Sequence, residues 1–402
     1  MRDVNNNTIE ERIAPAAKIL GAAAILFSAV HFWPWAESRI WQILNLSNLA
    51  MMLWCPVLVF VTARNREYVR SILPHTSVWA YLVVVFLSAA FAPSAARGLS
   101  FSIKLTLTFV AGFTLFSAAI RDGRNLRRAY DIVFAAAAIS VAACLVARFG
   151  FWSEKFGFHG NAYKYGTYLG MVVPVGACYY FFSESRARKL LGCALVISGL
   201  LSAGTVGAAA AITAGIGAAL FMGGKNNVRL AAGGSLVAGL ILAVLVNAPL
   251  RNDMRLAESD SADLRQRYIE WQAEINLLEE RAAVGSGAGS VNDYRSNFYY
   301  QLPKLNTLEA FDQNGWLATA AETGVLGLVC FCWIIVEYGR QALGQLRGNV
   351  VSQLAVSNFA GVAGACVANM FSSIHYNGIA ITFVLLLALI WRAGAVCAEG
   401  EQ

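Results

Sequence analysis

Long apolar stretches separated by short polar connections set the pattern of this chain. A transmembrane helix needs about 20 predominantly apolar residues. Stretches of that kind lie near residues 15–35, 41–63, 76–96, 99–120, 128–149, 162–182, 188–204, 205–223, 228–247, 316–338, 351–372 and 375–396. The seventh and eighth are short and run almost continuously through residues 202–205. The pattern predicts an all-α polytopic membrane protein with about twelve transmembrane helices.

The basic residues of the connections predict how these helices are oriented. One set of alternate connections is rich in Arg and Lys around residues 64–70, 121–128, 186–189, 225–229 and 340–347, and the opposite short connections hold few. Because cytoplasmic loops carry the excess of Lys and Arg, we expect both termini to be cytoplasmic. The same alternation places residues 248–315 outside, which in the inner membrane of a bacterium means the periplasm.

Composition agrees with a membrane protein and argues against other classes. The 402 residues are 57% hydrophobic and 14% charged, whereas a soluble domain carries roughly 25% charged residues. The net charge of +7 lies in short connections, so we expect membrane lipids and no nucleic acid as partners. All eight cysteines fall inside or at the edge of apolar stretches, which favours packing over disulfide or metal roles. The polar N-terminal segment is not typical of a cleaved signal peptide, so we expect the first helix to be retained.

The polar segment 248–315 separates a nine-span N-terminal bundle (1–247) from three C-terminal spans and a short cytoplasmic tail (316–402). Within it, an amphipathic helix is predicted over residues 259–283. Its expected apolar face consists of Leu264, Tyr268, Trp271, Ile275 and Leu278. Gly285 is expected to end the helix, and the glycine-rich residues 285–291 are expected to form a flexible run.

Two groups of residues in and after this segment carry the candidate chemistry. The first is Arg267 four residues before Trp271, followed by Gly285 and Gly287. The second is Asp312-Gln313-Asn314 followed by Glu322-Thr323-Gly324 and Gly327, and residues 157–161 add His159 and Asn161 before the sixth span. In order and placement these motifs resemble the O-antigen ligase and O-antigen polymerase family of bacterial membrane glycan transferases.

The resemblance implies a glycosyltransferase-like (GT-C-like) membrane fold with its long loop between spans nine and ten. It also implies transfer of a glycan from undecaprenyl pyrophosphate to a hydroxyl of a glycan or lipid-linked acceptor at the periplasmic face. Other polysaccharide-assembly proteins are candidate partners. Arginine forms bidentate bonds with phosphate oxygens, which suits Arg267 to the leaving group. Neither a cofactor nor a metal is expected, since the sequence shows no clustered Asp or His.

The chain departs from the family pattern at two places. Gln313 replaces the histidine that commonly precedes the asparagine, and an amide cannot act as a general base. Asp312 and His159 are therefore alternative bases. The seventh span also ends in Ser202-Ala203-Gly204-Thr205, where the family often has a serine-arginine pair. Lys104 or Lys164 could supply the missing cation.

The candidate catalytic residues are thus Arg267, Gln313, Asn314 and Asp312, and the candidate substrate-binding residues are Arg265, Trp271, Gly285, Gly287, His159, Asn161, Lys164, Lys104 and Glu322. A purely structural interpretation stands beside each. Arg267 could stack on Trp271 or pair with Glu270, and Arg265 lies on another helix face. Asn314 could cap a helix and Lys104 could snorkel to the interface. His31, His75 and His375 lie at membrane edges and are interpreted as interfacial residues.

Several functions remain open from the sequence. A polymerase of exopolysaccharide or O-antigen repeat units is favoured over a ligase to lipid A-core, because the ligases rely on the histidine that Gln313 replaces. A transporter or flippase is a different class, but it would place charges and broken helices at the membrane midplane. A non-catalytic subunit of a polysaccharide-export assembly is the third alternative.

Overall fold

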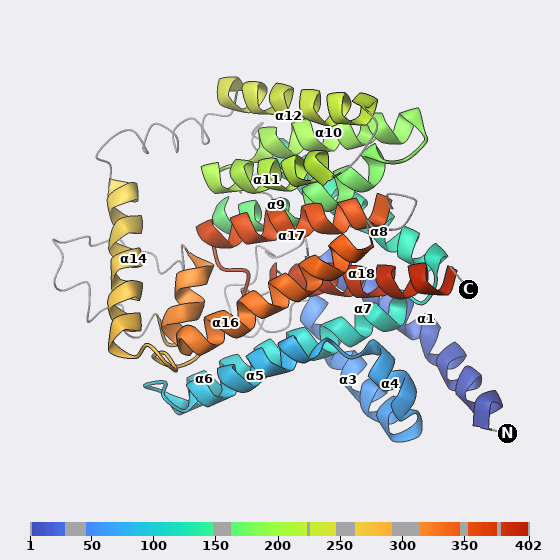
Figure 1. Cartoon of the computed structure of the whole chain (residues 1–402), viewed down its shortest axis with the longest axis vertical. Coiled ribbons are helices and arrows are strands. Elements are labelled where there is room, and N and C mark those ends of the chain that lie inside the picture. Colours follow the sequence, from blue (N-terminus) through green and yellow to red (C-terminus); the bar gives the residue numbers. More distant parts are fainter. Residues whose placement is uncertain are drawn as a thin grey trace.

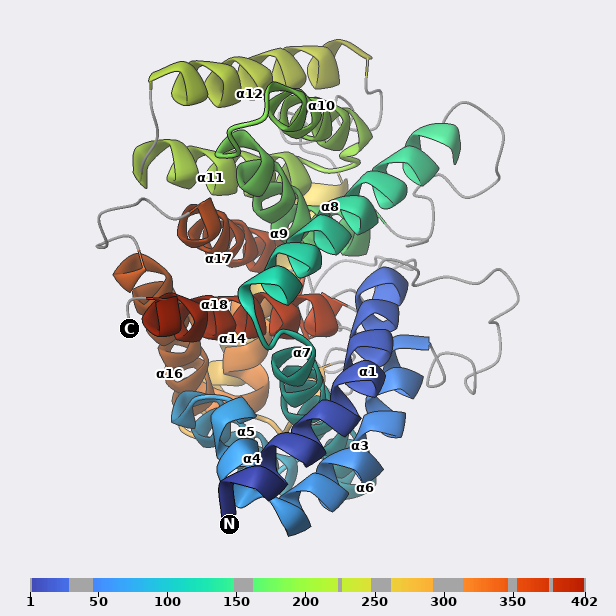
Figure 2. The same ribbon diagram turned by 90° about the vertical axis from the view of Figure 1, so that its right-hand side faces the viewer.

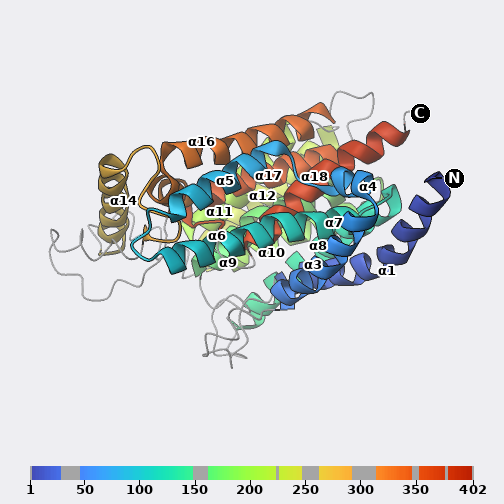
Figure 3. The ribbon, with the colours of Figure 1, turned by 90° about the horizontal axis from the view of Figure 1, so that it is seen from below.

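A computed structural model describes residues 2–28, 46–147, 162–222, 226–246, 262–291, 314–345, 353–375 and 379–400. Every regular element in these ranges is a helix. Most helices run roughly along one direction, and both chain termini lie at the same end of the bundle (Figure 1). At the opposite end, helix α14 (Ala262–Glu280) lies across the direction of the others (Figures 1 and 3). We call these the terminal end and the α14 end.

Each of the twelve predicted apolar stretches overlaps a helical segment of the structure. These are α1 (Arg2–Ser28), α3 (Leu46–Arg64), α5 (Thr76–Ala89), α6-η1-α7 (Ala95–Thr106, Leu107–Gly112, Phe113–Ala119), α8 (Gly123–Val146), α9 (Ala162–Phe181), α10 (Arg186–Ser202), α11 (Val206–Met222), α12 (Asn226–Val246), α16 (Gly315–Gly344), α17 (Gln353–Phe371) and α18 (Ile379–Gly400). The short helix α4 (Arg66–Ile72) precedes α5 at an angle of 84°.

Only some of these helices are long and apolar enough to cross a membrane by themselves. Five qualify among the described residues, namely Ala95–Ala119, Gly123–Val146, Gly315–Gly344, Gln353–Phe371 and Ile379–Val396. The bent pair α4–α5 makes a sixth if it counts as one span. The structure is thus all-helical and consistent with a multi-pass membrane protein, while the count of twelve crossings stays a prediction.

Small residues let the central helices α9, α11 and α17 approach closely (Figure 2). A Cβ atom added to Gly364 would overlap the carbonyl oxygen of Gly170, and one added to Gly215 would lie 2.5 Å from Pro174 Cγ. Close backbone contact through glycine and alanine is how helices associate in lipid, where the hydrophobic effect does not drive them together. Helix α17 of this core also contacts α16 and α18, which carry the candidate site.

Helix α14 lies within the range predicted for an amphipathic helix, and the structure shows which of its faces is buried. Glu270 and Glu274 are almost fully buried, whereas Trp271 and Ile275 are 37% and 36% exposed. Periodicity shows which apolar positions share a face, and it does not show whether that face meets protein or the membrane interface. Here the carboxylates face inward and the apolar pair faces out.

Candidate active site at the α14 end

A sharp kink in α16 organises this end of the molecule. Gly324 has φ 69° and ψ −176° inside the helix, which separates a short first segment (residues 315–323) from a long second one (Figure 1). Only glycine adopts such a conformation without strain. A Cβ atom on Gly324 would also overlap the carbonyl oxygen of Ala283. The Glu-Thr-Gly motif therefore forms a turn, which we call the Glu322 turn (residues 321–325).

The glycine-rich run after α14 is bound to this turn by main-chain hydrogen bonds. Ser286 N–H donates to Ala321 O (2.8 Å), Gly287 N–H to Glu322 O (3.0 Å), and Val325 N–H donates back to Ala282 O (2.8 Å). Gly285, Gly287 and Gly289 all have positive φ. The expectation of a flexible run is wrong, because three glycines are needed to bring two backbones into contact.

These bonds also decide how the glycines can act. The N–H groups of Gly285 and Gly287 donate to Arg281 O (2.9 Å) and Glu322 O. A phosphate nest needs free, convergent N–H groups. The structure therefore gives these two residues a packing role and argues against direct binding of phosphate by their backbone.

Helix α5 joins the same turn, which the sequence did not predict. The Ser88 hydroxyl donates to Glu322 O (2.5 Å), and the Arg281 guanidinium donates to Phe91 O (3.3 Å). A Cβ atom on Gly287 would overlap the backbone of Ala92. Three segments far apart in sequence thus meet at the Glu322 turn. Ser88 gave no signal, since it is one serine in an apolar stretch.

Asn314 caps the first segment of α16. Its side-chain oxygen accepts hydrogen bonds from the N–H groups of Trp316 (3.0 Å) and Leu317 (3.2 Å), which satisfies two of the donors left open at a helix start. The structural interpretation of Asn314 therefore holds. The cap also fixes where the chain enters the segment.

A histidine that the sequence placed at the membrane edge lies inside this site. His375 Nε2 is 3.2 Å from the Tyr81 hydroxyl and 3.1 Å from Thr319 Oγ1. Its ring stacks on Tyr81 (centroids 5.8 Å apart) and meets Phe331 at 5.1 Å. His375 lies in the connection between α17 and α18, outside the candidate spans, and burial lowers its pKa to about 4. A buried imidazole resists protonation because the charged form loses hydration.

The comparison with protein families agrees with the joined motifs. Residues 161–332 match a family model described as O-antigen ligase. This match supports the resemblance of the chain to the O-antigen ligase and O-antigen polymerase family. No curated protein matches the chain. The matched segment contains α14, the glycine-rich run and the Glu322 turn, so the motif residues that touch in the structure all fall within it.

The match supports glycan transfer of the ligase or polymerase type in general. His375 follows the end of the O-antigen ligase segment by 43 residues. The family motif alone therefore could not have identified it.

The O-antigen ligase segment also contributes a lysine near a second one. Lys104 on α6 and Lys164 on α9 lie close enough that the charge of Lys164 acts on Lys104. Lys104 is exposed and Lys164 is half-buried. Two like charges brought together from different helices suit an anion that contacts both. The two lysines that the sequence offered as alternatives thus lie within electrostatic range of each other.

The predicted arginines lie on α14, whose backbone is described at these positions. By helical spacing, position 267 shares a face with Glu270 and Glu274, the two buried carboxylates. Position 265 lies on another face. Asp312, Gln313, His159 and Asn161 lie outside the described residues.

Among the residues that the structure describes, no three His, Cys, Asp or Glu side chains form a group that could hold a metal ion. The charged groups near the Glu322 turn are instead Arg281 and the Glu322 carboxylate, whose charge acts on Tyr81.

Proposed function

We propose that this protein transfers an undecaprenyl-pyrophosphate-linked glycan to an acceptor hydroxyl at the periplasmic face of the bacterial inner membrane. In this proposal all twelve apolar helical segments cross the bilayer, both termini are cytoplasmic and residues 248–315 are periplasmic. The position of α14 at the end opposite the two termini supports this orientation (Figure 3).

The observation that carries the proposal is the contact between the two motif segments at the Glu322 turn. The glycine-rich run ends α14, the helix that carries Arg267, and it is hydrogen-bonded to Ala321 and Glu322. The short segment of α16 begins at Asn314 and ends at the same turn. The helix that carries position 267 and the segment that begins at Asn314 are therefore held in a fixed relation, which suits a site that holds one donor and one acceptor.

The residue types suit departure of a pyrophosphate. Negative charge develops on the leaving oxygen, and donors placed there stabilise the transition state by about 3–4 kcal/mol each in comparable sites. Arg267 supplies a bidentate donor in this proposal. Lys104 and Lys164 supply the cationic pair that replaces the arginine missing after the seventh span.

We favour polymerisation of exopolysaccharide or O-antigen repeat units over ligation to lipid A-core. The reason is Gln313, which replaces the histidine on which the ligases rely. A polymerase gives a ladder of products that differ by one repeat unit, whereas a ligase gives one product per glycan. Gel separation of products made by the purified protein distinguishes the two.

The test uses full-length protein in liposomes. The substrate is lipid-linked oligosaccharide extracted from cells that lack this protein. We expect the wild type to lengthen or transfer the glycan and Arg267→Ala to lower the rate by about 10²-fold. Glu279→Ala is the matched control, because Glu279 is exposed on the same helix. The proposal is overturned if the purified wild-type protein transfers no glycan and cells that lack the protein still make polymer of normal length.

A further inference from the structure

His375 is held against the part of α16 that follows Gln313. The turn that carries it is fixed by Asn369, whose side-chain oxygen accepts from Ile374 N–H (3.0 Å), and by Ser373, whose hydroxyl accepts from His375 N–H (3.2 Å). A Cβ atom on Gly315 would lie 2.7 Å from Ser373 Cα. The connection between α17 and α18 therefore packs on the residue two positions after Gln313, with no room for a larger side chain.

The hydroxyls of Thr319 and Tyr81 both lie within hydrogen-bond distance of His375 Nε2, and the Thr319 contact favours the tautomer with its proton on Nε2. The Thr319 hydroxyl donates to Gly315 O (2.6 Å), so its oxygen remains free to accept from His375 Nε2–H at 3.1 Å. A neutral imidazole with its proton on Nε2 has an acceptor lone pair on Nδ1. Nδ1 is buried, and no described residue hydrogen-bonds to it. The ring thus offers one basic nitrogen to a molecule that enters the site.

We propose that His375 is the general base of the transfer, taking the role that the family histidine has where this chain has Gln313. The inference rests on the proposed function. As the acceptor oxygen bonds to the anomeric carbon, the bond from that carbon to the pyrophosphate oxygen breaks, and its electron pair leaves with the pyrophosphate. The proton of the acceptor hydroxyl moves to Nδ1 of His375, and from there to water. No electron donor or oxidant is required.

The surroundings of the ring suit this role. Tyr81 from α5 and Phe331 from α16 enclose it, and Phe383 from α18 packs on Phe331 (centroids 6.1 Å apart). The titratable groups that act on the adjacent Tyr81 are Glu322 and Cys330 of α16. The aromatic rings limit the hydration of the imidazole, which disfavours its charged form. An anionic pyrophosphate bound nearby favours the imidazolium that proton transfer creates.

The experiment compares wild type, His375→Asn, Gln313→His and the double variant with the same lipid-linked oligosaccharide. We expect His375→Asn to lower kcat by about 10²-fold or more, the usual contribution of a positioned base, with KM changed much less. The double variant restores a histidine at the family position, and we expect it to recover at least tenfold of the lost rate. A merely structural histidine would not be replaced from position 313.

A conservative second variant and one measurement on the wild type keep the inference testable if His375→Asn does not fold. His375→Gln retains an amide that can reach Thr319, and we expect the same loss of kcat. In the wild type, kcat/KM should be flat from pH 8 to about 5 and fall in more acidic solution. The control is His75→Gln, because His75 lies at the start of α5 beside Glu337 of α16. We expect its transfer rate to equal that of the wild type.

The outcomes separate this inference from the proposed function. If the wild type transfers glycan and folded His375→Asn does so at the same rate, the base is another residue and this inference fails alone. A wild-type rate that already falls between pH 8 and 7 as the solution is acidified contradicts it as well. If the wild type transfers no glycan at all, the proposed function fails first.

Discussion

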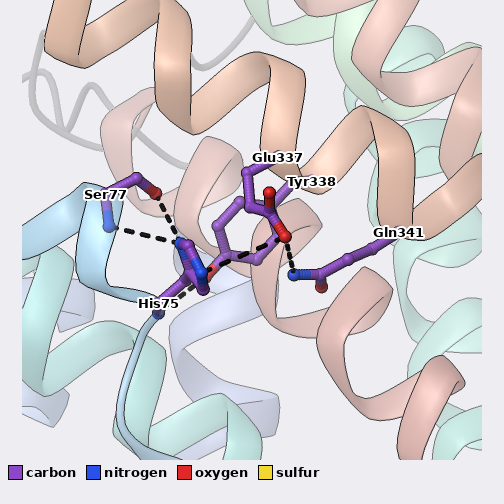
Figure 4. Close-up of polar contacts among 5 residues, drawn as sticks. All are labelled: His75, Ser77, Glu337, Tyr338 and Gln341. Carbon is purple, nitrogen blue, oxygen red and sulfur yellow. Dashed lines mark hydrogen bonds and ion pairs between the residues drawn. The ribbon is translucent and has the colours of Figure 1, made fainter.

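Two histidines lie beside α16 in opposite settings. His75 lies at the start of α5, and its Nε2 is 4.0 Å from a Glu337 carboxylate oxygen (Figure 4). The backbone N–H of His75 donates to the Tyr338 hydroxyl at 3.3 Å. Gln341 donates to the same carboxylate, and the side chains of the ion pair are about a quarter exposed. His375 contacts two hydroxyls and two aromatic rings instead.

The difference shows how one residue type serves two purposes. The His75 imidazole has a carboxylate oxygen 4.0 Å away, and its side chain is about a quarter exposed. The His375 ring has a buried Nδ1 and two aromatic rings packed against it, and the loss of hydration disfavours its charged form. The α14 end thus combines an imidazole packed between aromatic rings with a turn that only glycine can form, whereas the His75 cluster is a polar contact between two helices.

The largest effect is expected from Gly324→Ala at the Glu322 turn. Alanine cannot adopt φ 69° and ψ −176° without strain, and its Cβ would overlap Ala283 O. Together these should destabilise the protein by about 4 kcal/mol or more. We expect poor yield in detergent, a much lower melting temperature and no transfer.

Gly339→Ala is the matched control toward the opposite end of the same helix. A Cβ atom there meets nothing within 4 Å. Because alanine is the better helix former, the melting temperature should stay the same or rise, with a gain of up to about 1 kcal/mol. If both variants lower the melting temperature equally, the kink at Gly324 is no more sensitive to an added Cβ atom than the rest of α16.

The sequence predicted the helices well and their contacts poorly. Apolar stretches long enough to span a membrane are a strong local signal, so every predicted stretch overlaps a helix. Periodicity placed Trp271 on an apolar face of α14, but it could not tell whether that face meets lipid, the interface or protein, and the structure buries Glu274 instead. The kink at Gly324 was not predicted, because a positive φ leaves no mark in the sequence except the glycine itself.

The candidate site was predicted in part. The motif residues Gly287 and Glu322 do meet, although as a structural contact and not as ligands of phosphate. His375 was interpreted as interfacial because it stands alone between two apolar stretches. Its partners, Tyr81 and Thr319, lie 294 and 56 residues away in sequence, and no spacing rule connects them.

The next largest effect concerns the lysine pair. Lys104→Ala should lower transfer by about 10²-fold if the pair stabilises the leaving pyrophosphate, equivalent to about 3 kcal/mol. Lys104→Arg keeps the charge and should retain most of the rate. The measurement is the single-turnover rate with extracted lipid-linked oligosaccharide. Full activity of Lys104→Ala would remove this cation from the site.

A smaller effect is expected in the pH dependence of stability. The pKa of His375 is about 4 in the folded protein, below the ordinary 6.5, so the unfolded chain binds the proton more readily between these values. Stability should therefore fall as the pH drops from 6.5 to 4, by at most about 1.4 kcal/mol per pH unit. Thermal melts of wild type and His375→Asn measure it, and parallel curves over this window would contradict the burial of the ring.

The smallest effect is expected at the His75 cluster. Glu337→Gln removes the charge of a half-exposed ion pair 4.0 Å long, and such pairs contribute about 0–1 kcal/mol. The glutamine can still accept from Gln341, so the melting temperature should shift by no more than a few degrees. Transfer should be unchanged, because the cluster lies far along α16 from the Glu322 turn. A loss of transfer as large as that of His375→Asn would mean that the two ends of α16 are coupled, and the contrast between the two histidines would then no longer separate a structural contact from a catalytic one.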